Sequence, residues 1–307
     1  MRIGMMSTAI QSPSRGLDEV VAEAKKIESD GFDSLWAPNI MGLDAMTALA
    51  VAGMETSRIE LGTAVVPTYP RHPHAMAQQA LTTAVAANGR FALGIGLSHK
   101  IVIEDMMGMS YEKPGRHMRE YLEVLGGLLR GETVNHQGDL YQVTAPLQVA
   151  QAPSVPIIVA ALGPMMLGLA GRLADGTITW MTGAKTLESH IIPAIRRAAS
   201  EAGKPAPRVV CGLPILLAKD PAAVRESLSK ALAMYGTLPS YRAMLDREGV
   251  DGPGDIAIVG DEAVVGSELD RLRELGVTDF NAAIVPVEPG GFERTYEFLK
   301  ERVGSKS

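Results

Sequence analysis

Short apolar runs alternate along this chain with longer segments in which apolar residues recur at helical spacing. The first apolar run, residues 3–7, precedes a segment at 17–30 whose apolar positions share one helical face and which ends before Gly31. The alternation continues to a last strand at 279–285 and a closing helix at 292–303. Further strands are predicted at 32–37, 59–66, 91–96, 155–160, 177–181 and 209–217, and further helices at 44–56, 74–88, 115–129, 164–174, 186–202, 222–235 and 268–275.

The number of these strand–helix units predicts the fold class. The predicted strands contain few alternating polar residues, as expected of a parallel sheet covered by helices. Eight such units favour a (β/α)8 TIM-like barrel over the alternative, a doubly wound sheet. With 307 residues, 46% of them apolar, we expect one barrel domain over residues 1–307. Insertions are expected near 97–114, at 133–149 as a hairpin, and at 239–266, where the pattern is less regular.

Composition narrows the possible partners. A net charge of −6 without a basic block argues against nucleic acid or an anionic membrane. The single cysteine, Cys211, excludes an intrachain disulfide, and no cysteine pair suggests a zinc site. No run reaches transmembrane length, and residues 1–7 are too short an apolar run for a signal peptide. We therefore expect a cytoplasmic protein that acts on a small molecule and binds no metal.

The turn after the strand at 155–160 is the strongest local signal for a ligand. Ala161, Leu162 and Gly163 lead directly into Pro164, which suits the first turn of a helix. Small residues let a ligand approach the backbone, and a helix start offers unpaired N–H groups at the positive end of its dipole. Together these features indicate a phosphate site. An ordinary strand-to-helix turn explains them equally well, because no lysine, serine or threonine completes a P-loop.

The residues expected at the carboxyl ends of the strands, where barrels place their chemistry, are mostly small or apolar. Few carboxylates occur there, which suits a flat organic cofactor better than hydrolysis or a metal. The run Gly94-Ile95-Gly96 lacks the last glycine of a dinucleotide-binding motif. Ser98 follows it without the closing glycine of a nucleophile elbow, so we expect Ser98 to contact a ligand rather than to attack one.

Histidines and methionines offer a few further candidates. His99 lies just past a predicted strand end and either contacts a ligand or is an unremarkable loop residue. His72 and His74 are interpreted as surface or capping residues rather than metal ligands, because no carboxylate is adjacent. Most methionines are expected to fill the core, but three in the insertion above the barrel mouth could line an adaptable apolar pocket: Met106, Met107 and Met109.

Several stretches, taken in order and spacing, match a known family. They are 32–39, 58–67 with Arg71-His72-Pro73, 89–96, 118–123 with 128–132, 160–167 and 174–177. From about residue 2 to residue 200, and more loosely beyond, the chain resembles the luciferase-like flavin and deazaflavin oxidoreductases. It is most similar to their coenzyme F420-dependent branch. The resemblance implies a TIM-like barrel with insertions.

The resemblance also implies roles for individual residues. Ala64 and Val65 match the place of a non-prolyl cis peptide behind the deazaflavin ring, whose bulge would bend the ring toward hydride transfer. The loop after strand four, with Leu97, Ser98 and His99, matches the loop that contacts the cofactor. The turn formed by Ala161, Leu162, Gly163 and Pro164 matches the turn that contacts the cofactor tail. Thr182 and Lys185 match positions near the ring or the substrate.

One departure from the family changes the expected substrate. The sugar-phosphate dehydrogenases of this branch carry an Asp-His pair after strand two and a glutamate in the strand-four loop. Here those positions are Asn39-Ile40 and His99. Asn39 can hydrogen-bond a ring edge of the cofactor but cannot titrate, so oxidation of an alcohol is not expected.

The resulting expectation is an F420-dependent oxidoreductase that moves a hydride between the deazaflavin and an electron-poor organic substrate, in the direction of reducing an activated double bond. His99 or solvent would supply the proton. We also expect a homodimer. Two alternatives stay open: an FMN-dependent monooxygenase served by a separate flavin reductase, and a non-catalytic paralogue that binds flavin or F420.

Overall fold

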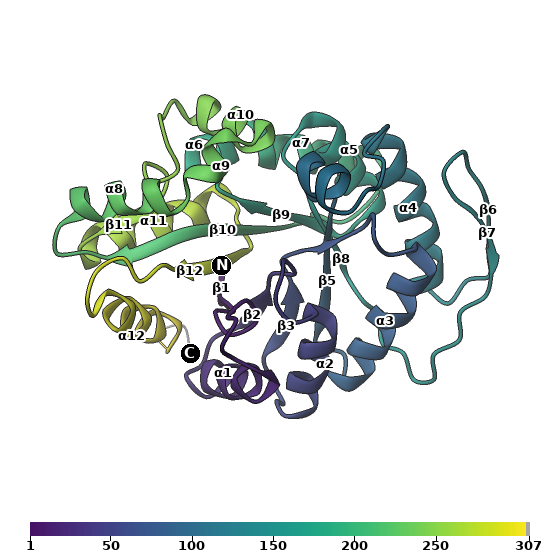
Figure 1. The fold of residues 1–307 in the computed structure, drawn as a ribbon, viewed down its shortest axis with the longest axis horizontal. Coiled ribbons are helices and arrows are strands. Elements are labelled where there is room, and N and C mark those ends of the chain that lie inside the picture. Colours follow the sequence, from purple (N-terminus) through teal and green to yellow (C-terminus); the bar gives the residue numbers. More distant parts are fainter. Residues whose placement is uncertain (305–307) are drawn as a thin grey trace.

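Parallel strands close into a barrel in the computed structural model, which describes residues 1–304. Strand β10 pairs with both β9 and β12, and β12 returns to β1, so the circle is complete (Figure 1). The predicted TIM-like barrel is therefore confirmed. Its strands are β1 (Arg2–Met6), β2 (Ser34–Ala37), β3 (Glu60–Thr63), β5 (Phe91–Gly96), β8 (Ile157–Ala160), β9 (Gly176–Trp180), β10 (Arg208–Leu217) and β12 (Asp279–Ile284).

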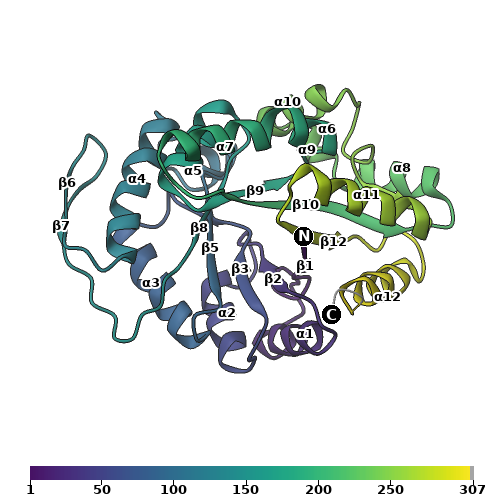
Figure 2. The ribbon, with the colours of Figure 1, turned by 180° about the vertical axis from the view of Figure 1, so that it is seen from behind.

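Helices cover the outside of this barrel (Figure 2). Several start where aspartate side chains accept a hydrogen bond from a first-turn N–H, as Asp44, Asp220 and Asp261 do. The main helices are α1 (Leu17–Ser29), α2 (Ala45–Met54), α3 (Pro73–Ala86), α4 (Pro114–Leu129), α5 (Pro164–Leu173), α7 (Ile192–Glu201), α8 (Pro221–Ala231), α11 (Glu262–Leu275) and α12 (Gly291–Gly304). Within residues 1–304, none of the helices combines the length and the apolar character that crossing a membrane requires.

Trp36 fills the interior of the barrel. Its indole nitrogen donates a hydrogen bond to Ser34 Oγ at 2.9 Å. Glycines on the neighbouring strands make room for this pair, because a Cβ on Gly62 would lie 2.4 Å from the Trp36 ring and one on Gly4 would lie 2.1 Å from Ser34 Oγ. The buried residues packed around Trp36 are Ala92, Ile158, Ile178 and Val210.

An ion-pair network closes the amino-terminal end of the barrel. Arg208 Nη2 lies 2.8 Å from Glu60 and 2.7 Å from Asp279, and Arg2 Nη1 lies 3.1 Å from the same Glu60. The Asp279 side chain is almost completely buried, and the guanidinium of Arg208 pairs with it there. This network occupies one end of the barrel, which leaves the carboxyl ends of the strands for ligands.

The third strand is interrupted, contrary to the continuous strand predicted at 59–66. It ends at Thr63, the Ala64–Val65 peptide is cis, as the family resemblance implied, and a short strand β4 (Val66–Pro67) then pairs with β5. The Thr63 hydroxyl bridges the gap by hydrogen-bonding both the N–H and the C=O of Gly94. A Cβ on Gly94 would lie 1.8 Å from the Thr63 carbonyl oxygen. The Gly94-Ile95-Gly96 run therefore serves close packing of β5 against this bulge.

The insertions differ in how well they follow the prediction. The hairpin is confirmed as β6 (Val134–Gln137) and β7 (Gln142–Ala145), which project beyond α4 (Figure 1). Segment 239–266, for which the less regular pattern predicted no element, contains α10 (Pro239–Glu248), β11 (Ile258–Gly260) and the first turn of α11. The Asp261 cap explains why α11 starts at residue 262 instead of 268.

Three segments depart from the predicted single helices or loops. Insertion 97–114 contains a π-helical segment, η1 (Val102–Met106). The helix predicted at 222–235 divides into α8 and α9 (Ala233–Thr237). The helix predicted at 186–202 starts earlier, with α6 (Ala184–Thr186) and a π-helical η2 (Leu187–Ile191), and Pro193 then opens α7. Because proline lacks an N–H, regular hydrogen bonding cannot run through this point.

Candidate active site

An apolar floor lies at the carboxyl end of the barrel. Ala64, Val65 and Ala160 are half-buried and pack against the Trp36 cluster. A Cβ on Gly96 would lie 2.8 Å from Val65 Cγ2 and 3.1 Å from Ala160 Cβ, so glycine is needed for these two side chains to approach each other. A flat chemical group could pack against this floor, whose side chains are small and uncharged.

The loop after β5 is held by hydrogen bonds to its backbone. Ser98 adopts a left-handed conformation, with φ of 60°, and its carbonyl accepts a hydrogen bond of 3.3 Å from the Tyr111 hydroxyl. The His99 carbonyl accepts hydrogen bonds from the N–H groups of Val102 and Ile103, at 2.9 and 3.0 Å, which starts η1. Tyr111 was missed in the sequence because its partner is 13 residues away in a loop. The expected ligand contacts of Leu97, Ser98 and His99 stay predictions.

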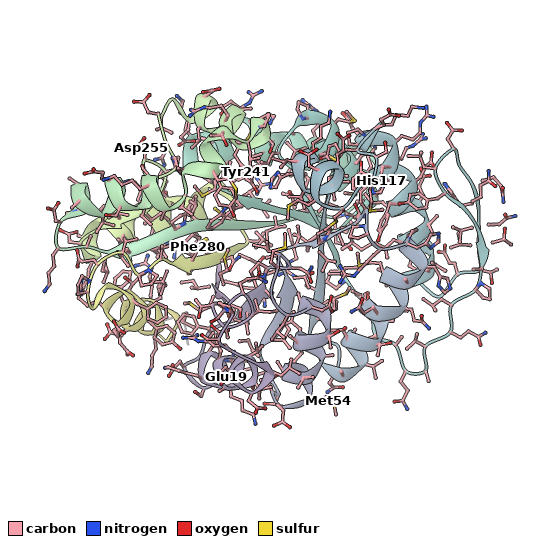
Figure 3. All side chains as sticks on the ribbon, viewed as in Figure 1. Glu19, Met54, His117, Tyr241, Asp255 and Phe280 are labelled. Atoms are coloured by element: carbon pink, nitrogen blue, oxygen red, sulfur yellow. The ribbon has the colours of Figure 1, made fainter. Side chains whose placement is uncertain are left out.

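The His99 side chain begins a series of aromatic rings at this end of the barrel. Its ring centroid lies 5.6 Å from that of Tyr241, which is labelled in Figure 3. Tyr235 lies 5.2 Å from Tyr241, and Trp180, at the end of β9, lies 6.0 Å from Tyr235. Burial lowers the pKa of His99 below its usual 6.5. The series joins rings from β9, α9 and α10 to the loop after β5, and no local sequence pattern marks such contacts between distant segments.

The turn from β8 into α5 has open space at the helix start. Gly163 is the N-cap, no side chain caps the helix, and a Cβ on Gly163 would meet no atom within 4 Å. The carbonyl of the preceding residue, Leu162, forms a hydrogen bond of 2.8 Å with His190 Nε2. No local sequence signal marks this contact, because His190 is 28 residues away from Leu162 in the chain. The open helix start fits a phosphate, which needs room and unpaired N–H donors.

Three other candidate residues contact the protein itself. Asn39 Oδ1 accepts a hydrogen bond of 2.9 Å from Ala45 N at the start of α2. Thr182 is fully buried and donates to the Trp180 carbonyl at 3.3 Å. Lys185 is exposed and its Nζ lies 3.3 Å from the Glu248 carbonyl oxygen. Their expected contacts with cofactor or substrate stay predictions.

Two carboxylates that the sequence did not place here stabilise the loops of the same end. Glu23 accepts hydrogen bonds from Ser7 Oγ at 2.5 Å and from Thr8 N at 2.9 Å. Glu248 accepts from Thr186 Oγ1 and N, at 2.6 and 2.8 Å. Both are bound within the protein, so neither forms a free acid–base pair. Within residues 1–304, histidine, cysteine and carboxylate side chains form no group of three that could hold a metal ion.

The remaining candidates of the sequence analysis lie at the edge of this region. His72 Nδ1 accepts a hydrogen bond from His74 N at 3.2 Å, which confirms His72 as a capping residue, at the start of α3. Met106, Met107 and Met109 are exposed, with 61%, 41% and 37% of their surface accessible. That they line an apolar pocket stays a prediction.

His117 belongs to a second aromatic cluster, separate from the one around His99. Its ring stacks on Tyr69 with centroids 3.9 Å apart, and its Nε2 hydrogen-bonds Thr68 Oγ1 at 2.8 Å. Burial lowers its pKa to about 4, although nearby Glu120 opposes the shift. Figure 3 labels His117 and Tyr241, which lie apart on the molecule. Both ring nitrogens of His117 have partners within the protein, Thr68 Oγ1 for Nε2 and the Tyr141 hydroxyl, at 3.3 Å, for Nδ1.

Acidification is expected to destabilise the protein through His117. The unfolded chain binds a proton at this side chain below about pH 6.5, whereas the folded chain binds it only below about pH 4. Stability is therefore lost as the pH falls through this window, by up to about 3 kcal/mol. Urea unfolding at pH 7 and pH 4.5 should show a smaller loss for His117→Gln than for the wild type. Equal losses in both proteins would contradict the assignment.

Comparisons with known proteins show the family of this chain and agree with its fold. Residues 1–279 match the family model described as luciferase-like monooxygenase. The chain is 29% identical over 269 residues to 5,10-methylenetetrahydromethanopterin reductase of Methanolobus tindarius, which covers 87% of this chain and 81% of that relative. It is 34% identical over 178 residues to a putative coenzyme F420-dependent oxidoreductase of Mycobacterium tuberculosis, which covers 53% of this chain and 50% of that relative. The structure of coenzyme F420-dependent tetrahydromethanopterin reductase from Methanopyrus kandleri superposes with a TM-score of 0.81, at 23% identity, over 98% of this chain and 97% of that chain.

Proposed function

We propose, since the chain belongs to the luciferase-like monooxygenase family, that this oxidoreductase uses coenzyme F420 to reduce an activated double bond in a small organic substrate. Family membership supports an oxidoreductase with a flavin or deazaflavin cofactor acting on small molecules. Two observations support F420 in particular. One is the similarity to the coenzyme F420-dependent oxidoreductase of Mycobacterium tuberculosis named above, and the other is the set of motifs shared with the F420-dependent branch.

The observation that carries the proposal is the open start of α5 at the same end of the barrel as the apolar floor. Ala64, Val65 and Ala160 offer a surface for a flat ring, and Gly163 leaves space for a phosphate at a helix amino terminus. A ring and a phosphate joined by a flexible linker are the common parts of F420 and FMN. The residues present thus fit a cofactor of this class.

The side chains around the apolar floor would bind the cofactor, orient the substrate and shield both from water. When bound, F420 supplies a hydride carrier, and the protein supplies orientation and electrostatics. The rings of Trp180, Tyr235 and Tyr241 would exclude water from the substrate, and the His99 ring lies beside that of Tyr241. The carboxylates nearby are bound within the protein, so this site does not support acid–base chemistry on an alcohol.

The direct test is a binding titration of the purified protein with F420, FMN and NADPH, followed by cofactor and tryptophan fluorescence. We expect saturable binding of F420, weaker binding of FMN and none of NADPH. Tighter binding of FMN than of F420 would favour a flavin-dependent monooxygenase. Absence of binding by every cofactor would overturn the proposal.

Loss of the His190 side chain is expected to weaken cofactor binding modestly. His190 holds the Leu162 carbonyl at 2.8 Å and so positions the turn before α5. A hydrogen bond of this kind contributes about 1 kcal/mol, which corresponds to roughly a fivefold higher Kd for F420 in His190→Ala. His190→Gln, which can place an amide N–H near the same carbonyl, should recover most of the affinity. Similar Kd values for all three proteins would show that the turn does not need this contact.

A further inference from the structure

A groove on the outer surface between α4 and α5 carries three arginines, and we call it the arginine groove. It has a volume of about 400 Å³, and its wall includes Pro164 and Met165, the first two residues of α5. Arg116 and Arg119 belong to α4, and Arg172 belongs to the last turn of α5. The two helices lie side by side in both views (Figures 1 and 2). Among the described residues that line it, there is no carboxylate.

The positive charge of the arginine groove is only partly neutralised. The ion pairs found within residues 1–304 do not include Arg172. The carboxylate nearest to Arg119 is that of Glu120, at 3.8 Å, and Glu120 is buried and accepts hydrogen bonds from the hairpin backbone. Arg116 pairs with Asp139, whose side chain is largely exposed. In a chain with a net charge of −6, such a concentration of arginines indicates an anionic ligand.

The arginine groove continues from the place where the proposed phosphate would lie. Pro164 directly follows Gly163, the open N-cap, and Arg172 is eight residues further along the helix. At 1.5 Å per residue this is about 12 Å, a span that a few linked amino-acid units cover. Gly168 lies between them without a side chain, and the position of a Cβ there would be 3.1 Å from Arg172 Nη1. The guanidinium therefore reaches back along the groove toward the helix start.

We propose that the arginine groove binds a chain of linked carboxylates that continues from the phosphate at α5, which is the chemistry of the glutamyl tail of coenzyme F420. This inference rests on the proposed function. Arginine suits such a ligand because its planar guanidinium can donate two parallel hydrogen bonds to a carboxylate. FMN ends at its phosphate, so the groove adds affinity for F420 and none for FMN.

The test compares F420 forms that differ only in the tail. Dissociation constants are measured by fluorescence, at low salt, for the phosphorylated deazaflavin without glutamates and for forms with two and with five glutamates. For the wild-type protein we expect at least tenfold tighter binding of the five-glutamate form than of the tail-less form. Arg172→Gln and Arg119→Gln should each remove a large part of this difference, and the double variant should abolish it. Both side chains are exposed, so folding should be unaffected.

Two controls separate this proposal from the proposed function. Arg271→Gln removes an exposed arginine of α11, on the far side of the molecule from α4 and α5 in Figure 1, and should leave the tail dependence unchanged. The tail-less form should bind equally to all variants. If it binds but tail length has no effect, or if the arginine variants keep the full effect, the groove proposal is overturned while the proposed function stands. If no F420 form binds, the proposed function itself fails.

Discussion

Replacing Gly163 by aspartate is expected to weaken the binding of F420 roughly 100-fold, which is about 2.7 kcal/mol. The new carboxylate would lie at the start of α5, where the phosphate is proposed to meet the helix N–H groups. Two like charges at one helix start repel each other, and the aspartate would also accept the N–H bonds that the phosphate needs. The measurement is a fluorescence titration of the variant with F420.

The fold should tolerate this change, which makes the result interpretable. A Cβ on Gly163 meets no atom within 4 Å, and the residue has φ of −83°, which any amino acid can adopt. Aspartate and asparagine are also favoured as N-cap residues. Gly163→Asn is therefore the matched control, with the same size and capping ability but no charge, and we expect it to lose less than tenfold. An aspartate variant that binds as tightly as the asparagine variant would exclude phosphate from this turn.

The barrel was predictable because its signals are local and repeated. Most strands are short apolar runs and most of the main helices have one apolar face, so eight units could be counted without knowing their contacts. Segments 239–248 and 258–260 were missed for the opposite reason. Helix α10 has few buried residues, with Met244 and Leu245 as the fully buried ones, so its sequence shows no clear apolar face.

The candidate site was only partly predictable because it is assembled from residues distant in the sequence. The turn at Gly163 can be predicted from the sequence, because small residues directly follow an apolar strand. By contrast, His190 and Tyr111 act through single hydrogen bonds to the carbonyls of Leu162 and Ser98, and no pattern in the chain marks such contacts. The glycines of β5 show that a sequence pattern can also suggest a site where there is none. The run Gly94-Ile95-Gly96 resembles part of a dinucleotide-binding motif, but close packing explains its glycines.

Replacing His99 by alanine is expected to lower turnover by about 10²–10⁴-fold if His99 is the proton donor, with F420 affinity nearly unchanged. The ring lies among aromatic side chains at the open end of the barrel, within 5.6 Å of the Tyr241 ring centroid. Because the bond from the His99 carbonyl into η1 involves the backbone only, the variant keeps the loop anchored. Turnover is followed by the loss of reduced F420 absorbance, with an electron-poor alkene or imine that the wild type reduces.

The pH profile separates a proton donor from a side chain that only shapes the pocket. Burial lowers the pKa of His99 below 6.5, so at neutral pH the ring is mostly neutral and the donating, protonated form accumulates as the pH falls. The kcat/KM of the wild type should therefore rise on acidification through that lowered pKa and level off below it. His99→Gln, which keeps a polar side chain that cannot titrate, should lose both the rate and this rise. A loss smaller than threefold, with the wild-type pH profile retained, would assign the proton to solvent and leave His99 as part of the pocket wall.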